Sequence, residues 1–488
     1  MRPLLSVLRK DMYKAGHPFQ YPKDTEMVYS NLTARGSRVA AADGVIAFGF
    51  QYWVQAWLID DFNRNFFNRS KDSAIRQYSR RMANAIGPLA SYDHIAALHD
   101  LGYLPICVKA VPEGLKIPLR VPLLTIRNTH PAFSWLTNML ETNMSSVLWR
   151  MITSATTAFG YRTVFEAYAK KTGASKDFVK WQGHDFSMRG LDPEAAIRSG
   201  AAHLISFTGT DTIPAIDFLE DYYGADCEKE LIGGSVAATE HSVMCMGGPS
   251  GEEDIYRRLL TEVYPTGVVS VVSDTYSFWD VLTKLLPSLK EVILSRDGKL
   301  VIRPDSGDPV KIICGDPSAA LGSPERAGAI RLLYKVFGGT KNLAGFIELD
   351  PHIGLIYGDS ITQDRQEAIL GGLAAAGFAS SNVVLGIGSY TYQYVTRDTY
   401  GLAVKGTFAQ VSGEARNIFK KPLTDDGTKH SAKGMIRVEM TPEGVISFKD
   451  GVSWADESGG ILQCVFRDGR AANIQTLAEI RARIEAQL

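Results

Sequence analysis

One stretch of the chain, VIRPDSGDP at residues 301–309, combines residue types that suit the binding of a phosphorylated sugar. The apolar residues at its start predict a buried strand, which ends abruptly at Arg303. An arginine guanidinium can grip a phosphate through two parallel hydrogen bonds. Asp305 can accept from sugar hydroxyls or hold Mg²⁺, and Gly307 lets the backbone approach a ligand closely. A polar turn after a strand is the alternative interpretation of one such segment.

The same pattern recurs in further apolar runs that stop at small or acidic residues. These runs are LISFTGTD ending at Asp211, VVSVVSD ending at Asp274, GLIYGD ending at Asp359, and VVLGIGS ending at Gly388 and Ser389. Several of these ends lie about 30 or about 55 residues apart, which corresponds to one or two β–α units. Parallel strands that are buried on both faces read as continuous apolar runs. The pattern therefore predicts an α/β fold with a parallel sheet.

These strand ends also predict where the site lies, because ligands of α/β folds bind at the carboxyl ends of the strands. We expect an irregular, incomplete β/α barrel-like domain over residues 148–398. A chain of 488 residues needs a second domain. Residues 1–147 read as mixed helix and strand, and residues 399–488 as hairpins with a final amphipathic helix. We expect these two segments to form one discontinuous α+β domain, with the barrel as an insertion.

Composition excludes several functional classes. The formal net charge of −1 argues against a nucleic-acid footprint and against a polybasic membrane patch. Five scattered cysteines form no CxxC pair, so neither a structural zinc site nor a disulfide framework is predicted. The first residues lack the long apolar region of a signal peptide, and no apolar run reaches membrane-spanning length. We expect reduced thiols and a cytoplasmic protein.

A series of short motifs points to a family. In chain order they are DMYKAGH, VYSNLTAR, VKAVPEG, HDFSMRG, FTGTDT, TEHS, VSVVSD, RPDSG, YGDS, TRD and FKKP. Each is weak alone, but in this order, over nearly the whole chain, the sequence resembles the nicotinamide phosphoribosyltransferase family. The resemblance implies the fold of type II phosphoribosyltransferases, a homodimer with active sites at the interface, and a role in NAD salvage. The implied reaction joins nicotinamide to phosphoribosyl pyrophosphate and gives nicotinamide mononucleotide and pyrophosphate.

The resemblance implies a pyridine pocket made of Phe186, Asp211 and Arg303, with Tyr13 reaching in from the partner subunit. It also assigns Arg189, Ser235 and Ser270 to substrate binding. Two aromatic faces can sandwich a flat pyridine. Asp211 can accept from a carboxamide NH₂, whereas it would repel a carboxylate by about 4 kcal/mol at about 4 Å and an effective dielectric of about 20. The residue types therefore favour nicotinamide over nicotinate, although Asp211 alone equally fits an ordinary turn.

Further positions match the family's sugar and phosphate contacts. Ribose and 5-phosphate would be held by Asp305, Gly358, Asp359, Gly388 and Ser389, and phosphate oxygens across the dimer interface by Arg35, Arg397 and Lys405. One departure concerns GIGSYTY, where the family has a run of glycines. Ser389 keeps a backbone N–H and adds a hydroxyl, while Tyr390 narrows the loop if it points inward.

His241 matches the histidine that ATP phosphorylates in this family, which makes ATP a facultative co-substrate. A neutral imidazole is a reasonable nucleophile toward a γ-phosphate. Neighbours on one strand point to opposite faces, so Asp274 is a better placed partner for the imidazole than Glu240. Lys420 and Lys429 resemble lysines that contact the nucleotide phosphates. The catalytic assignment is therefore His241, Asp274 and Asp305, with Mg²⁺ held through pyrophosphate rather than by a protein cage.

The implied chemistry needs no general base, because the pyridine nitrogen that attacks C1 of the ribose has no proton to lose. Positioning and neutralisation of the departing pyrophosphate should carry the catalysis. Two alternatives remain open. One is a nicotinate phosphoribosyltransferase on the same fold, which Asp211 disfavours. The other is a non-catalytic binding or signalling protein that kept the fold.

Overall fold

The structure is a computed structural model that describes residues 4–39, 42–358, 360–419 and 432–488. By its internal contacts the chain divides into two compact units. Unit 1 comprises Met1–Thr156, Glu220–Ala225 and Val395–Gln487, and unit 2 comprises Thr157–Leu219, Asp226–Tyr394 and Leu488. Sequence patterns had placed the boundaries at residues 148 and 398. Two helices, α6 (Glu141–Thr172) and α9 (Ile213–Tyr223), include residues of both units.

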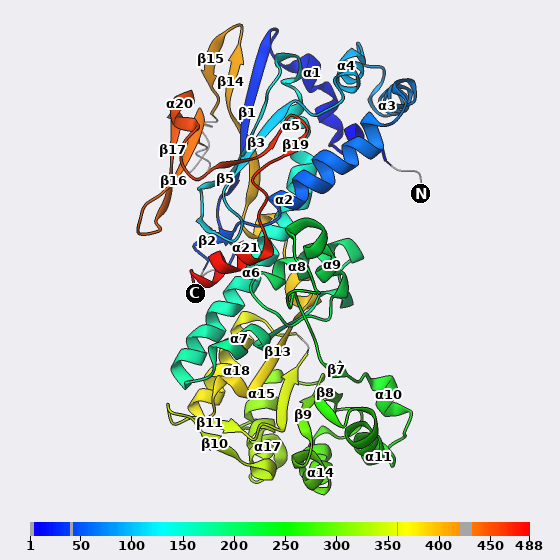
Figure 1. Ribbon diagram of the computed structural model, residues 1–488, viewed down its shortest axis with the longest axis vertical. Coiled ribbons are helices and arrows are strands. Elements are labelled where there is room, and N and C mark those ends of the chain that lie inside the picture. Colours follow the sequence, from blue (N-terminus) through cyan, green and yellow to red (C-terminus); the bar gives the residue numbers. More distant parts are fainter. Residues whose placement is uncertain (1–3, 40–41, 359, 420–431) are drawn as a thin grey trace. The chain divides into compact units, whose positions relative to one another are not determined.

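Unit 2 is built around a parallel sheet, which within the described residues has six strands in the order β6-β13-β12-β9-β8-β7. The strands are β6 (Gly183–Phe186), β7 (Ala237–Ala238), β8 (Thr266–Val272), β9 (Asp297–Arg303), β12 (Ile353–Tyr357) and β13 (Val383–Gly388). Their apolar side chains are buried together with those of the surrounding helices. The predicted parallel sheet of continuous apolar strands is confirmed, and Figure 1 shows it in the lower part of the view.

Two short segments link the edges of this sheet. Isolated parallel bridges join Asp185 on β6 to Thr210, and Gly209 to Gly234. The Thr210 N–H donates to the Gly234 carbonyl at 2.9 Å, and the chain then continues from Gly234 into β7. The sheet thus curves into an irregular barrel in which the segment at Gly209 and Thr210 is joined to each neighbour by one bridge, and the predicted fold class is confirmed.

Helices and a small hairpin precede or follow the strands of unit 2 along the chain (Figure 1). The helices include α7 (Lys176–Gln182), α8 (Pro193–Leu204), α10 (His241–Cys245), α11 (Glu252–Arg258), α14 (Lys290–Leu294), α15 (Pro309–Cys314), α17 (Ala329–Phe337), α18 (Gln363–Ala375) and α19 (Ser389–Gln393), and the hairpin joins β10 (Gly339–Lys341) to β11 (Ile347–Leu349). The turn after β9 shows how local sequence directs this order. Gly307 has φ +93°, Asp308 caps α15 by accepting from two backbone N–H groups, and Pro309 opens the helix.

Unit 1 contains an antiparallel sheet, which within the described residues has seven strands in the order β15-β14-β1-β5-β3-β18-β19. They are β1 (Thr25–Ala34), β3 (Ile106–Ala110), β5 (Pro122–Asn128), β14 (Leu402–Val411), β15 (Glu414–Asn417), β18 (Gln463–Arg467) and β19 (Arg470–Ala471). Strands from the start of the chain therefore form the centre of the sheet, and strands from its end flank them on both sides. Two further antiparallel pairs join β2 (Gly44–Ile46) to β4 (Lys116–Pro118) and β16 (Met435–Met440) to β17 (Ile446–Val452).

Helices complete unit 1, among them α3 (Lys71–Ile86), α4 (Asp93–Leu101) and the final helix α21 (Leu477–Glu485). α21 is amphipathic as predicted, with Leu477, Ile480 and Ile484 buried. The motif VKAVPEG supplies Glu113, which is fully buried and accepts from the backbone N–H groups of Gly49 and Gln51, both at 2.7 Å. Among the described residues, no helix is long and apolar enough to cross a membrane.

Candidate active site

A cavity of about 660 Å³ lies inside the parallel barrel of unit 2. Five residues that the sequence assigns to substrate binding contribute to its lining: Phe186, Asp211, Ser235, Ser270 and Arg303. They come from β6, β8, β9 and the two short bridging segments, which are far apart in the sequence. Side chains from these strands and segments thus converge on one cavity, as the expected pyridine pocket requires.

Asp211 follows the bridge at Thr210 and is held through one of its two carboxylate oxygens. His184 Nε2 and the Ser235 hydroxyl both lie near Oδ1, at 2.9 and 2.6 Å. Partial burial raises the pKa of Asp211, but the bonds from His184 and Ser235 and the charge of Arg303 outweigh it and leave the pKa below its ordinary value. The carboxylate is therefore ionised at neutral pH and only accepts, so His184 Nε2 is the donor.

His184 is a residue that the sequence reasoning missed. It precedes Phe186 by two positions on β6, so both side chains point to the same face of the strand, and strand alternation was the signal that could have found it. The two rings lie 4.8 Å apart between centroids, tilted by 44°. Gly209 makes room for the imidazole, because a Cβ at Gly209 would lie 2.8 Å from His184 Nδ1.

The expected ribose positions meet beside Phe186. A Cβ on Gly358, directly after β12, would lie 3.1 Å from Asp305 Oδ1 and 3.9 Å from the Phe186 ring. A Cβ on Gly388, at the end of β13, would lie 3.1 Å from the Phe186 Cβ. The ends of three strands therefore approach one another closely, and the glycines keep the space between them free of side chains.

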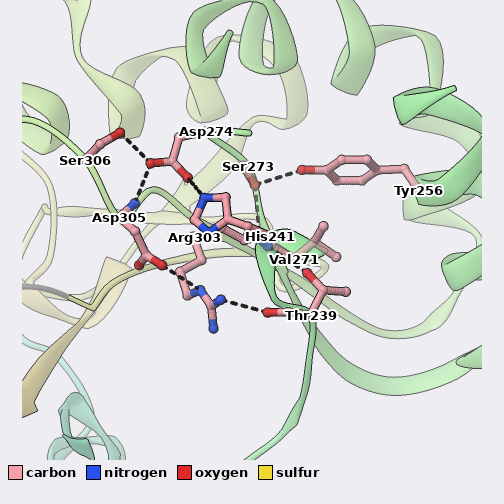
Figure 2. Close-up of polar contacts among 10 residues, drawn as sticks. Thr239, His241, Tyr256, Val271, Ser273, Asp274, Arg303, Asp305 and Ser306 are labelled. Carbon is pink, nitrogen blue, oxygen red and sulfur yellow. Dashed lines mark hydrogen bonds and ion pairs between the residues drawn. The ribbon is translucent and has the colours of Figure 1, made fainter. Parts of the chain in front are cut away.

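Arg303 connects this pocket to the segment before His241 (Figure 2). Its Nη2 donates to the Thr239 carbonyl at 2.7 Å, and its Nε lies 3.7 Å from Asp305 Oδ2. Burial raises the pKa of Asp305 despite the opposing charges of Arg303, His241 and Arg189. Arg189 itself is exposed in the turn Ser187–Arg189 after β6. Cationic groups thus surround a half-buried carboxyl group at the strand ends.

His241 begins the short helix α10 rather than continuing a strand. Its Nε2 lies 3.2 Å from Oδ1 of Asp274 (Figure 2). The other carboxylate oxygen of Asp274, Oδ2, accepts from the Asp305 N–H at 3.0 Å and from the Ser306 hydroxyl at 2.5 Å. Burial raises the pKa of Asp274, but these three partners outweigh it, so the pKa lies below its ordinary value. The His241 side chain is 48% exposed, so a ligand can reach it.

Tyr256 and Ser273 form hydrogen bonds that hold the backbone just before Asp274. The buried Tyr256 hydroxyl donates to Ser273 Oγ at 2.8 Å, and Ser273 Oγ donates to the Val271 carbonyl at 2.7 Å. The Ser273 N–H donates to the Arg303 carbonyl at 2.9 Å, which locks the ends of β8 and β9 together (Figure 2). Glu240 is engaged elsewhere, because its carboxylate accepts from the Ser242 hydroxyl.

The predicted residues of unit 1 lie on its surface. Tyr13 is 65% exposed, and Lys14 Nζ lies 5.3 Å from its ring centre. Arg35 directly follows β1 and donates from Nε to the Gly401 carbonyl at 3.2 Å, just before β14 begins. Arg397 pairs with its neighbour Asp398, and Lys405 lies on β14 opposite Asn31. The three basic residues thus gather around one end of the β1–β14 pair, and all are exposed.

The remaining predicted residues are those of the segment after β12, the nucleotide lysines and the GIGSYTY segment. Asp359, Lys420 and Lys429 lie outside the described residues. Ser389 begins α19 directly after β13, and Tyr390 packs against Tyr394 with ring centroids 4.7 Å apart. In the described part of the chain, no group of three His, Cys, Asp or Glu side chains is arranged to hold a metal ion.

Sequence comparison relates the chain to known enzymes. Residues 181–461 match the nicotinate phosphoribosyltransferase (NAPRTase) family, and residues 6–108 match the N-terminal domain of nicotinamide phosphoribosyltransferase. The chain is 51% identical to the nicotinamide phosphoribosyltransferase of Acinetobacter baylyi over 98% of this chain and 96% of that protein. It is 35% identical to the enzyme of the same name from Mycoplasma pneumoniae, over 88% of this chain and 95% of that protein.

Solved structures share the fold at low sequence identity. The nicotinate-nucleotide pyrophosphorylase of Pyrococcus furiosus aligns with a TM-score of 0.62 at 13% identity, over 99% of this chain and 95% of that one. Human nicotinic acid phosphoribosyltransferase aligns with a TM-score of 0.55 at 16% identity, over 98% and 93% of the two chains. Both are similar in fold alone. With the sequence matches, the site geometry and this fold together, the chain belongs to the nicotinamide phosphoribosyltransferase family of type II phosphoribosyltransferases.

Proposed function

We propose that the chain transfers the phosphoribosyl group of phosphoribosyl pyrophosphate to nicotinamide, giving nicotinamide mononucleotide and pyrophosphate. The observation that carries this proposal is the ionised Asp211 beside Phe186 in the barrel cavity. Both donors to Asp211 meet its Oδ1, and within the described residues Oδ2 has no hydrogen-bond donor. An N–H of a carboxamide fits that oxygen.

Ser270 offers the complementary group. Its hydroxyl is buried on the cavity wall and has no hydrogen-bond partner in the described part of the chain. Leaving a buried hydroxyl unpaired costs about 1–3 kcal/mol, so a ligand atom that accepts from it is favoured. The carboxamide of nicotinamide would accept from Ser270 through its oxygen and donate to Asp211 through its nitrogen. A nicotinate carboxylate would meet the Asp211 charge, with a repulsion of about 4 kcal/mol at about 4 Å.

The transfer itself rests on positioning and charge. Phe186 and, by our proposal, Tyr13 of a second subunit would stack the pyridine so that its nitrogen faces C1 of the ribose. Asp305 would stabilise the positive charge that develops on the ribose, and this is supported by Gly358, which leaves space beside the Asp305 carboxyl group. Arg303 and Arg189 supply positive charge near the same point. Such preorganised charges act without reorganisation during the reaction.

Mg²⁺ fits this site as an ion that the pyrophosphate carries. Asp305 offers a carboxylate oxygen, which is a ligand type that Mg²⁺ prefers. Mg²⁺ commonly binds through one or two carboxylates plus substrate phosphates. When bound, the ion would neutralise charge on the departing pyrophosphate. Arg35, Arg397 and Lys405 are proposed to contact phosphate oxygens in the same way as the family's basic cluster.

The proposed coupling to ATP runs through His241. Because His241 Nε2 faces the Asp274 carboxylate, it carries the proton in the neutral imidazole, and Nδ1 presents the lone pair that would attack the γ-phosphate. Arg303 offers a physical connection, since it contacts the Thr239 carbonyl two residues before His241 and also lines the cavity.

We further propose a homodimer and nucleotide contacts from Lys420 and Lys429. The cytoplasmic location stays a prediction.

A product assay tests the proposal. The full chain is incubated with phosphoribosyl pyrophosphate, Mg²⁺ and nicotinamide, with and without ATP, and the nucleotide product is identified by mass spectrometry. We expect nicotinamide mononucleotide in both reactions, with a lower KM for nicotinamide when ATP is present. Absence of any nucleotide product would favour a non-catalytic binding protein, and a requirement for nicotinate would favour the alternative substrate.

A further inference from the structure

Two cysteines from distant parts of the chain meet on one face of the antiparallel sheet in unit 1. In the pairing of β3 with β18, Cys464 lies opposite Lys109, and Arg467 lies opposite Cys107. Residues opposite each other, and residues two apart on one strand, point to the same face. Cys107 and Cys464 therefore occupy diagonal positions on one face of the sheet. Neither takes part in the proposed transfer reaction.

Cys107 has an arginine directly opposite it on each neighbouring strand. Arg127 on β5 pairs with Cys107 from one side, and Arg467 on β18 from the other. Directly opposed residues have Cβ atoms about 4.5–5.5 Å apart, so both guanidinium groups are within reach of the sulfur. The Cys464 thiol and these two arginines together hold the pKa of Cys107 below its ordinary value, against the opposing effect of burial.

The local backbone gives the second cysteine freedom to move. The β3–β18 register shifts between Cys464 and Phe466, so Val465 forms a bulge beside the cysteine. β18 is bordered on its other side only by the two-residue strand β19 within the described residues. Diagonal Cα atoms lie about 7–8 Å apart, whereas disulfides usually span about 4.4–6.8 Å. A small shift of the bulged strand would bring the two sulfurs into bonding range.

We propose that Cys107 and Cys464 form a peroxide-reactive thiol pair, with Cys107 as the attacking thiolate and Cys464 as the resolving thiol. The Cys107 sulfur attacks one oxygen of hydrogen peroxide, the O–O bond breaks, and the leaving hydroxide takes a proton to become water. The Cys464 sulfur then attacks the sulfenic sulfur of Cys107. An S–S bond forms, the S–O bond breaks, and water leaves with the Cys464 proton. Two electrons pass from the thiols to the peroxide.

The remaining cysteines provide an internal comparison. Cys227 and Cys245 are exposed, and Cys314 is partly buried. Burial raises the pKa of Cys314 to about 11, so it is protonated at neutral pH. Cys107 is only 5% exposed, so exposure alone would make it the least reactive of the set. Preferential oxidation of Cys107 would therefore report its electrostatic surroundings rather than its accessibility.

The test treats the reduced full-length chain with hydrogen peroxide at about pH 6.5, where ordinary thiols are protonated, blocks free thiols and maps peptides by mass spectrometry. We expect a disulfide-linked pair of peptides that contain Cys107 and Cys464, formed before Cys227 or Cys245 is oxidised. In Cys464→Ser, dimedone should trap a sulfenic acid on Cys107. In Cys107→Ser, Cys464 should stay reduced.

Arg467 variants separate the electrostatic cause from a structural one. Arg467→Gln should slow oxidation of Cys107 about threefold at this pH, because raising the pKa of Cys107 from about 6 to about 7 lowers its thiolate fraction by that factor. Arg467→Lys should restore most of the rate. Arg416→Gln is the matched control, because Arg416 lies exposed on β15 at the far edge of the same sheet. Earlier oxidation of Cys227 or Cys245, with neither a linked peptide pair nor a dimedone adduct on Cys107, would overturn the proposal. Equal rates in wild type and Arg467→Gln would overturn the role of the arginine.

Discussion

Asp211 is oriented before any substrate arrives, because two donors bind the same carboxylate oxygen. Hydrogen bonds to a charged group contribute about 1.5–3 kcal/mol each, so the bonds from His184 and Ser235 strongly favour one rotamer. The free oxygen then has a fixed direction relative to Phe186. A site that holds its hydrogen-bonding groups in place discriminates sharply against a ligand of the wrong charge.

We predict that His184 positions Asp211 for nicotinamide. Replacing His184 with leucine removes a donor, so KM for nicotinamide should rise about 10- to 100-fold, in line with one charge-assisted hydrogen bond, while kcat changes less. His184→Gln keeps an N–H within reach and should restore most of the affinity. Steady-state kinetics with nicotinamide and nicotinate measure both effects.

The control for this prediction is His203, another histidine of unit 2. Its ring is buried, hydrogen-bonds the Tyr392 hydroxyl at 2.8 Å and stacks on Phe207. His203→Gln should lower the melting temperature without changing the ratio of kcat/KM for the two substrates. A His184→Leu enzyme with the wild-type ratio and a normal melting temperature would show that Asp211 does not depend on His184.

His241→Ala should abolish the enhancement by ATP and leave slow synthesis without ATP. The imidazole is the proposed phosphate acceptor, but the transfer makes and breaks bonds only among pyridine, ribose and pyrophosphate. ATP hydrolysis, synthesis rate and melting temperature are measured on one preparation. His352→Ala serves as control, because His352 also pairs with an aspartate, Asp350 at 2.7 Å, but lies just before β12, at the opposite end of that strand from Gly358. Full ATP hydrolysis by His241→Ala would falsify the phosphohistidine proposal.

At the scale of elements, the sequence predicted those strands whose signals are local. β9 shows this well, since an apolar run, a glycine with positive φ and a capping Asp308 follow one another in nine residues. The strands β9 and β13 end at Arg303 and Gly388 as predicted, whereas β8 ends at Val272, two residues before the predicted end at Asp274. The segment at Gly209 and Thr210 forms two isolated bridge pairs, and Gly234 forms one. Their partners depend on the closure of the barrel rather than on their own local sequence.

The residues of the candidate site likewise include some that local motifs identified and some that depend on tertiary packing. Phe186 and Arg303 were identified from motifs, and both line the cavity. Tyr256 was missed, because its helix α11 reaches Ser273 only through tertiary packing, and no local pattern encodes that contact. Ser306 was assigned no role from the sequence, although it donates to Asp274.

We predict that Gly209→Ala weakens nicotinamide binding although position 209 is not assigned to any substrate contact. The new Cβ would lie 2.8 Å from His184 Nδ1, so the imidazole must move away from Asp211. KM for nicotinamide should rise about tenfold, comparable to a lost hydrogen bond to a charged group. Gly234→Ala, in the neighbouring bridging segment, is the matched control, because its Cβ would meet no atom closer than 3.5 Å. Equal KM values for the two variants would contradict this account.

At the scale of the whole molecule, segments from both ends of the chain complete one sheet. β14 pairs with β1, and β18 pairs with β3, so unit 1 requires residues that enclose unit 2 in the sequence. The formal net charge of −1 gives no long-range attraction for polyanions. Phosphate binding must therefore come from local groups such as the exposed cluster of Arg35, Arg397 and Lys405.

We predict that two inactive variants complement each other in a mixed dimer. Tyr13 is exposed and is proposed to stack on the pyridine of a second subunit, whereas Asp211 acts within its own. Mixing Tyr13→Ala with Asp211→Ala under conditions of subunit exchange should therefore restore up to about a quarter of the wild-type activity, since one of the two sites is intact in half of the dimers. Mixed dimers that are demonstrated by mass spectrometry but stay inactive would place Tyr13 in the site of its own subunit.

The most direct test of the central claim is a competition between nicotinamide and nicotinate at equal concentration, with limiting phosphoribosyl pyrophosphate. The ratio of the two mononucleotide products equals the ratio of kcat/KM values. For the wild type we predict at least about a hundredfold excess of nicotinamide mononucleotide, within the repulsion of about 4 kcal/mol expected at Asp211. Asp211→Asn should reduce that excess by about tenfold or more. A wild-type reaction that yields mainly nicotinate mononucleotide, or an Asp211→Asn enzyme with an unchanged ratio, would contradict the account.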